Sequence, residues 1–368
     1  MRILQVGKYP KERCGGVETA VYGLSEELAK AHDVEVLVCG PRARLETRGR
    51  VTEDVAPIWA TVFSTPLAPG LLARLRGARG FDVVQVSLQN PLAVLAYLLT
   101  RPPGKLVVWY HHDIVRQKRL GPLFAPIQAA FLCRADAIVA TSRAYADSSA
   151  ALRPFQDKVT VIPLGVPSEH ASQESLTSGR RLRDRFGGPL IVFVGRLVYY
   201  KGLPVLLEAM VGLDAKLVIV GTGPMDAELR AQAARLGLSD RVFFEFVPYE
   251  ESVTAYFLAA DAVVLPSTER TEAFGLSLLE AMACGKPVVA TELGTGTSVV
   301  CEDGVNGIVV PPGDSAALRS ALKRLLEDPA LARRFGEAGR EKVRTHYSVE
   351  AMTRSFVELY QRLLDAPC

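Results

Sequence analysis

The chain has 368 residues, of which 49% are hydrophobic and 23% charged, and its formal net charge is +3. This length exceeds one typical domain, so two domains are expected, and the composition is that of a globular protein. No apolar run reaches the roughly 18 to 20 residues of a membrane span, and the start MRILQVGKYP lacks the regions of a signal peptide. The six cysteines are scattered without a Cys-x-x-Cys pair, which favours reduced thiols in the cytoplasm over a zinc site.

The charge is unevenly distributed along the chain. Residues 1–168 carry 21 Lys and Arg against 14 Asp and Glu, whereas residues 169–368 carry 22 against 26. A basic first half favours an anionic partner, such as a membrane surface or a pyrophosphate-bearing acceptor. Nucleic acid is not expected as a partner, because no segment interleaves aromatic and basic residues.

The first residues predict an α/β domain that binds a nucleotide or a sugar diphosphate. A strand over 3–6 leads into a loop that ends in Gly15 and Gly16, followed by a helix over 17–30 and a strand over 34–39. This order of elements is typical of such domains. The two glycines either turn their amides toward a phosphate or form a plain tight turn.

Two later stretches of the first domain are rich in basic residues. Residues 42–80 are predicted to be irregular, apart from a short helix over 71–79. Residues 116–136, RQKRLGPLFAPIQAAFLCRAD, place basic residues before an amphipathic segment. This segment is either a surface helix on an anionic bilayer or a core-facing helix with a solvated basic end.

A predicted strand over 106–110 delivers His111, His112 and Asp113 at its carboxyl end. That end is the favoured place for ligand contacts in a doubly wound sheet. The two histidines are therefore either functional or simply structural.

The polar, Ser-rich residues 168–184 are predicted to be a linker. They separate an N-terminal domain, residues 1–167, from a C-terminal domain, residues 185–347, which residues 348–368 follow as a last helix.

The second domain opens with a predicted strand over 190–194 that ends in Gly195 and Arg196, and Lys201 follows five residues later. Arg and Lys in a strand-to-helix loop either clamp a diphosphate or remain solvated loop cations. The GTGP at 221–224 fails the dinucleotide fingerprint at its third position, so NAD is not expected.

Two carboxylates, Glu272 and Glu280, stand eight positions apart in a predicted strand–loop–helix–strand unit over 262–290. The amides of residues 274–276 lie at the helix N-terminus, where free N–H groups and the helix dipole attract an anion such as a diphosphate. Alternatively, Glu272 caps the helix and Glu280 is a solvated surface acid.

Three segments resemble the retaining glycosyltransferases of family 4. They are EAFGLSLLEAMACGKPVVAT (272–291), VGRLVYYKG (194–202) and DGVNGIVVPPGD (303–314). The resemblance extends over nearly the full chain. It implies the GT-B fold, in which two Rossmann-like, doubly wound α/β domains face a central cleft, and a C-terminal helix that crosses back to the first domain.

The resemblance also implies roles for individual residues. Arg196 and Lys201 would stabilise the leaving diphosphate, Glu272 would hold hydroxyls of the donor sugar, and His111 would contact that sugar. Glu280 would hold the nucleotide ribose, and the resemblance leaves open which histidine of the pair contacts the sugar. The implied substrate-binding residues are Gly15, Gly16, His112, Asp113, Gly195, Ala273, Phe274, Gly275, Leu276, Glu280 and Thr295.

The segments HHDIVRQKRL, VGRLVYYKG and ELGTGTS are most similar to bacterial O-antigen and exopolysaccharide members. These use GDP-mannose or a GDP-6-deoxyhexose such as GDP-rhamnose. The resemblance therefore implies a retaining hexosyltransferase that extends a polyprenyl-diphosphate-linked glycan at the cytoplasmic face of the inner membrane. No metal cofactor is expected, because the chain lacks an Asp-x-Asp.

Three alternatives remain at this point. One is a glycosyltransferase that uses a UDP-sugar. Another is a sugar-nucleotide epimerase on the GT-B fold, which would need no acceptor. The last is a non-catalytic subunit that only holds a sugar nucleotide.

Overall fold

The computed structural model describes residues 1–12, 15–62, 65–88, 90–111, 121–168, 171–247 and 253–366, with only the backbone of 121–123. The chain divides into two compact units. Unit 1 comprises Met1–Leu164 and Val349–Cys368, and unit 2 comprises Gly165–Ser348.

Unit 1 is built on an eight-stranded sheet with the order β10-β9-β8-β7-β1-β2-β4-β3. Every neighbouring pair is parallel except β3 and β4. The central strands are buried on both faces, which explains why most of their residues are apolar. The strands are β1 (Arg2–Val6), β2 (Asp33–Gly40), β3 (Arg44–Arg48), β4 (Val51–Pro57), β7 (Val83–Ser87), β8 (Lys105–Tyr110), β9 (Ala137–Ala140) and β10 (Val159–Val161).

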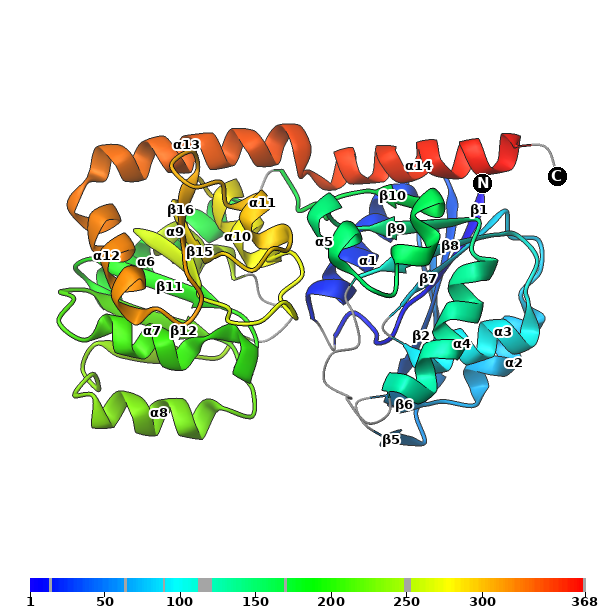
Figure 1. The fold of residues 1–368 in the computed structure, drawn as a ribbon, viewed down its shortest axis with the longest axis horizontal. Helices are drawn as coiled ribbons and strands as arrows, with labels where there is room; N and C mark the ends of the chain where they lie inside the picture. The colour runs from blue at the N-terminus through cyan, green and yellow to red at the C-terminus, as the bar shows by residue number, and fades with distance from the viewer. Residues whose placement is uncertain are drawn as a thin grey trace. The chain divides into compact units, whose positions relative to one another are not determined.

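Along the chain, the helices of unit 1 lie between its strands, except α14, which comes after unit 2 at the C-terminal end (Figure 1). They are α1 (Gly16–Leu28), α2 (Gly70–Gly77), α3 (Pro91–Thr100), α4 (Gly121–Arg134), α5 (Arg143–Ser148), the 3₁₀ helix η1 (Arg153–Lys158) and α14 (Val349–Asp365). Helix α4 turns Phe131 into the core, where its ring lies 5.5 Å from that of Tyr97 on α3. The C-terminal part of the predicted amphipathic segment thus faces the core. Its basic stretch, residues 116–119, lies outside the described residues.

The short helix predicted over 71–79 is confirmed by α2, but the prediction that the rest of 42–80 is irregular is wrong. That stretch contains β3, β4 and a separate two-stranded hairpin of β5 (Ala60–Val62) and β6 (Thr65–Leu67). Strand β3 lies at the edge of the sheet and is mostly exposed, so charged residues take the place of an apolar run. Arg44 of β3 pairs with Glu53 of β4 across the strands, an ion pair that single-sequence periodicity does not reveal.

The C-terminal helix α14, red in Figure 1, groups with unit 1 and contacts α1 and β8. The ring of its Phe356 lies 4.9 Å from that of Trp109. The hydroxyl of Tyr360 donates a hydrogen bond to the side-chain carbonyl of Gln85, and both side chains are fully buried. A buried polar contact of this kind fixes the position of the helix on the sheet.

Unit 2 is built on a six-stranded parallel sheet with the order β13-β12-β11-β14-β15-β16. The strands are β11 (Leu190–Val194), β12 (Lys216–Val220), β13 (Val242–Glu245), β14 (Ala262–Leu265), β15 (Val288–Thr291) and β16 (Gly307–Val310). The helices are α6 (Gln173–Phe186), η2 (Tyr199–Lys201), α7 (Leu203–Met210), α8 (Asp226–Arg235), α9 (Thr254–Ala259), α10 (Leu276–Ala283), α11 (Gly296–Val300), α12 (Ser315–Glu327) and α13 (Pro329–His346).

The predicted linker over 168–184 is wrong for most of its length, because helix α6 occupies it and belongs to unit 2. Ser172 caps this helix by accepting a hydrogen bond from the amide of Ser175. A Cβ on Gly179 would lie 3.0 Å from the Cβ of Leu258, so the helix packs closely on α9 through a residue without a side chain. Helix α13 was not predicted at all. Among the described residues, no helix is long and apolar enough to cross a membrane.

Candidate functional site

The loops after β11 and β14 lie against each other at the carboxyl ends of the strands of unit 2. A Cβ on Gly202, whose φ is 68°, would lie 1.9 Å from the carbonyl oxygen of Pro266. The amide of Thr268 donates a 2.8 Å hydrogen bond to the carbonyl of Tyr200. The chain leaves β11 toward β12 on one side and later returns to β14 on the other, so the strand order reverses here. Open α/β sheets bind ligands at such a switch point.

Lys201 and Glu272 meet at this switch point. The Lys201 ammonium lies 2.5 Å from a Glu272 carboxylate oxygen, and the two side chains are only 13% and 10% exposed. Ser267 donates a 3.0 Å hydrogen bond to the same oxygen, and Thr295 donates a 2.8 Å bond to the Glu272 backbone carbonyl. A carboxylate held by two side chains, on a residue whose backbone is held by a third, is preorganised to receive ligand hydroxyls.

Arg196 supplies a second cation from the loop after β11. Its side chain is exposed and forms no ion pair with any residue that the structure describes. A Cβ on Gly195 would lie 3.7 Å from the Lys201 ammonium, so the lysine folds back over the end of the strand. One loop therefore offers a guanidinium fork and an ammonium point charge, a combination suited to a diphosphate.

The N-terminus of helix α10 provides donors without side chains. Gly275 is its N-cap residue with a φ of 86°, and no side chain caps the helix, so Glu272 is not a cap. Within the described part of the chain, no acceptor binds the amides of Phe274, Gly275 and Leu276. The adjacent carbonyl of Ala273 accepts a 2.8 Å bond from the amide of Gly296, which fixes the loop. Free amides at a helix N-terminus attract an anion.

Glu280 lies on α10 among apolar residues. It is half-buried between the fully buried Leu279 and Ala281. Burial raises the pKa of its carboxyl group to about 7, and among the described residues no cation pairs with it. Glu280 is therefore not the fully solvated surface acid of the alternative hypothesis.

The GTGP segment at 221–224 has a packing role that the sequence did not predict. A Cβ on Gly221 would lie 2.1 Å from the carbonyl oxygen of Gly195, and one on Gly223 would lie 2.3 Å from that of Leu197. The amide of Leu197 donates a 2.9 Å bond to the carbonyl of Thr222. The glycines thus allow the loop after β12 to support the loop that carries Arg196.

Sequence reasoning missed two hydroxyl residues of the site. Ser267 lies two residues after the apolar strand β14, and Thr291 is the last residue of strand β15. Both side chains are buried. Besides binding Glu272, Ser267 accepts a hydrogen bond at its carbonyl from the Thr291 hydroxyl. A small hydroxyl residue at the carboxyl end of a buried parallel strand was the signal that would have indicated them.

In unit 1, His111 lies at the carboxyl end of β8 as predicted. It is 3% exposed, and its ring lies 4.6 Å from that of Trp109. His112 and Asp113 lie outside the described residues. The role of His111 as a sugar contact stays a prediction.

Gly15 and Gly16 lie near the switch point of unit 1, where the strand order reverses between β1 and β7. Gly15 is the N-cap residue of α1, and Gly16 is the first residue of the helix. Asn90 joins the loop after β1 to the loop after β7. Its side-chain amide donates a 3.2 Å hydrogen bond to the carbonyl of Gly7, and its side-chain carbonyl caps α3.

Within the described ranges, no three His, Cys, Asp or Glu side chains gather as a metal site.

Comparison with known proteins gave matches over both units. Residues 14–170 match the family described as Glycosyltransferase Family 4, and residues 181–342 match the one described as Glycosyl transferases group 1. The chain is 36% identical over 373 residues to the O-antigen chain mannosyltransferase C of Escherichia coli, covering 100% of both chains. It is also 36% identical over 349 residues to D-rhamnosyltransferase WbpZ of Pseudomonas aeruginosa, covering 94% of this chain and 91% of that one. Among solved structures, sucrose-phosphate synthase from Thermosynechococcus elongatus superposes with a TM-score of 0.82 at 25% identity, covering 100% of both chains.

Proposed function

The chain belongs to the family 4, or group 1, glycosyltransferases, and from this premise we propose that it transfers a mannosyl or 6-deoxyhexosyl residue from a GDP-linked donor to a lipid-linked glycan. It has the GT-B fold and is a hexosyltransferase of O-antigen synthesis. The donor base, the sugar and the lipid linkage are the proposed part.

The observation that carries the proposal is the meeting of Lys201 and Glu272 at the switch point of unit 2. Donor phosphates would draw the lysine partly away from the carboxylate and bind Arg196 and the amides at the start of α10. Glu272 would then be free to accept hydroxyls of the donor sugar, while Glu280 would accept those of the ribose. Because these groups are preorganised, they stabilise negative charge without reorganising during the reaction.

The chemistry proposed for this site is substitution with retention. The bond between the anomeric carbon and the diphosphate oxygen breaks, and the electron pair leaves with the diphosphate. The acceptor hydroxyl attacks from the same face, and its proton passes to the leaving diphosphate. Arg196 and Lys201 would carry the charge compensation that a bound metal supplies elsewhere, so the reaction is proposed to need no metal.

The choice of mannose or a 6-deoxyhexose as the transferred sugar is supported by the relatives. Two proteins at 36% identity over nearly the whole chain are named as a mannosyltransferase and a D-rhamnosyltransferase. The lipid-linked acceptor is supported by the O-antigen role of the first and by the basic composition of residues 1–168. Such a charge would favour peripheral contact with the anionic cytoplasmic face of a membrane.

The test is a thermal-shift panel in EDTA with GDP-mannose, GDP-rhamnose, UDP-glucose and UDP-N-acetylglucosamine. A ligand at about 100 times its Kd adds roughly 2.7 kcal/mol of stability. We expect shifts with the GDP-sugars, a loss of those shifts in Arg196→Gln, and unchanged shifts in Arg181→Gln, which removes an exposed charge elsewhere in unit 2.

Shifts with UDP-sugars alone would refute the GDP assignment and leave the enzyme class intact. Shifts that appear only with added Mg²⁺ would refute metal independence. Transfer to a polyprenyl-diphosphate-linked acceptor, with the anomeric configuration of the product read by NMR, then tests acceptor and retention.

A further inference from the structure

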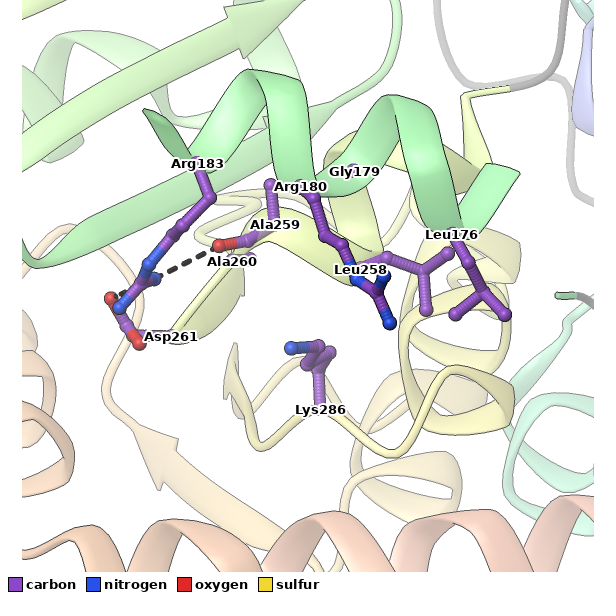
Figure 2. Close-up of a pocket in the computed structure, with 9 residues that line it drawn as sticks. All are labelled: Leu176, Gly179, Arg180, Arg183, Leu258, Ala259, Ala260, Asp261 and Lys286. Carbon is purple, nitrogen blue, oxygen red and sulfur yellow. Dashed lines mark hydrogen bonds and ion pairs between the residues drawn. The ribbon is translucent and has the colours of Figure 1, made fainter. Parts of the chain in front are cut away.

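Unit 2 has a hollow at the amino ends of its strands. Arg196, Lys201 and Glu272, here called the donor residues, lie at the opposite end of the sheet, after the carboxyl ends of the strands. Helix α6, the turn between α9 and β14, and the turn before β15 line it (Figure 2). Asp261 directly precedes β14, and Lys286 lies shortly before β15, whereas Ser267 and Glu272 follow β14. The hollow has a volume of about 390 Å³, within the usual range of small-molecule sites.

The charges around this hollow are not balanced. Arg183 donates a 2.6 Å hydrogen bond to Asp261 and a 3.0 Å bond to the carbonyl of Ala259, so its charge is compensated. Arg180 and Lys286 form no ion pair or hydrogen bond through their side chains with any other described residue. Figure 2 shows these two side chains reaching the hollow from opposite sides, Arg180 from α6 and Lys286 from the turn before β15.

Of the two cations, Lys286 is the more buried. Its side chain is half-buried, and burial is the main cause that lowers the pKa of its ammonium group. The positive charges of Arg183 and Arg340 lower the pKa further, and the negative charge of Asp261 raises it. A partly buried ammonium that lacks a close partner is stabilised when an anion binds beside it.

We propose that this hollow is a second binding site, for the phosphate group of a small phosphomonoester of about the size of a hexose phosphate. The phosphate lies between the Arg180 guanidinium, which offers a bidentate fork, and the Lys286 ammonium. The organic part lies against Leu176 and Leu258, which form the apolar wall. The site lies at the opposite ends of the strands from the donor residues, so it does not depend on the proposed transferase reaction.

Isothermal titration with glucose 6-phosphate tests the proposal, with inorganic phosphate and glucose titrated in parallel. We expect both phosphates to bind and glucose not to bind. Arg180→Gln and Lys286→Gln each remove a charge-assisted hydrogen bond, so each should raise the Kd about ten-fold. Arg181→Gln, on the same helix but outside the hollow, should leave the Kd within about two-fold.

Arg180 is exposed, so Arg180→Gln should fold normally and keeps the test valid if the half-buried Lys286 proves sensitive. Arg196→Gln separates the two sites, because phosphate held by the donor residues would weaken in that variant. No heat of binding at millimolar ligand would overturn the proposal. An equal loss in Arg181→Gln, or a loss in Arg196→Gln alone, would overturn it as well.

Discussion

Replacing Glu280 with Gln is expected to raise the stability of the protein and lower its affinity for the donor. Burial raises the pKa of this carboxyl group from 4.5 to about 7. The folded protein therefore holds the proton more tightly than the unfolded chain does. Glu280 costs no stability at a pH below its unfolded pKa, and it destabilises the fold increasingly as the pH rises toward and through 7.

The size of this cost follows from the change in pKa. A rise from 4.5 to about 7 corresponds to roughly 3 kcal/mol at a pH above both values. Because the residue is half-buried and retains some contact with water, we expect about 1 to 3 kcal/mol at pH 8. Glutamine has nearly the same shape without the charge, so the variant should avoid the cost at pH 8 and match the wild type near pH 4.5.

Urea unfolding at a series of pH values between about 4.5 and 8 measures the stability, and calorimetric titration with GDP measures the affinity. The affinity should fall about ten-fold, because a hydrogen bond from a ribose hydroxyl to a carboxylate becomes one to a neutral amide. Glu337→Gln, an exposed residue of α13, is the matched control and should change neither quantity. Unfolding free energies that run parallel for wild type and Glu280→Gln across this pH range would refute the reasoning from burial.

Other consequences of the structure can be tested by single or paired substitutions. Lys201→Met should cost about 3 kcal/mol because it leaves Glu272 buried without its cation, and adding Glu272→Gln should restore most of that stability in urea unfolding but not GDP binding. Tyr360→Phe should cost about 1 to 3 kcal/mol because the Gln85 carbonyl loses its donor, and hydrogen exchange should rise in α14 before it rises in unit 2. Gly223→Ala should cost about 1 to 3 kcal/mol and weaken GDP binding in calorimetry, because its methyl group would lie 2.3 Å from a backbone oxygen of the loop after β11.

The sequence by itself determined the elements that carry the donor residues. The buried parallel strands β11, β14 and β15 are short apolar runs, and Gly285 and Pro287 mark the end of α10, so local pattern and structure agree. The same sequence supplied Arg196, Lys201 and Glu272 as candidates in loops after strands, and Glu280 as a candidate on the helix that follows, because charged residues at such places are visible without a fold.

Local pattern failed where an element is mostly exposed. Strand β3 at the sheet edge and helix α6 are polar over much of their length, so few apolar residues mark them as ordered elements. Both are held by contacts between distant residues. Arg44 pairs with Glu53, and Gly179 lies against Leu258.

Only the tertiary structure decided which of the candidate residues meet. Lys201 and Glu272 are brought together because the chain returns to the far side of β11 and places β14 beside it, a crossover that no local pattern specifies. The pKa of Glu280 depends on what surrounds it, and the GTGP glycines are required by a backbone that approaches from another strand. Where a helix or strand begins and ends follows from interactions between near neighbours in the sequence. Burial, ion pairing and loop contacts depend on residues that only the fold brings close together.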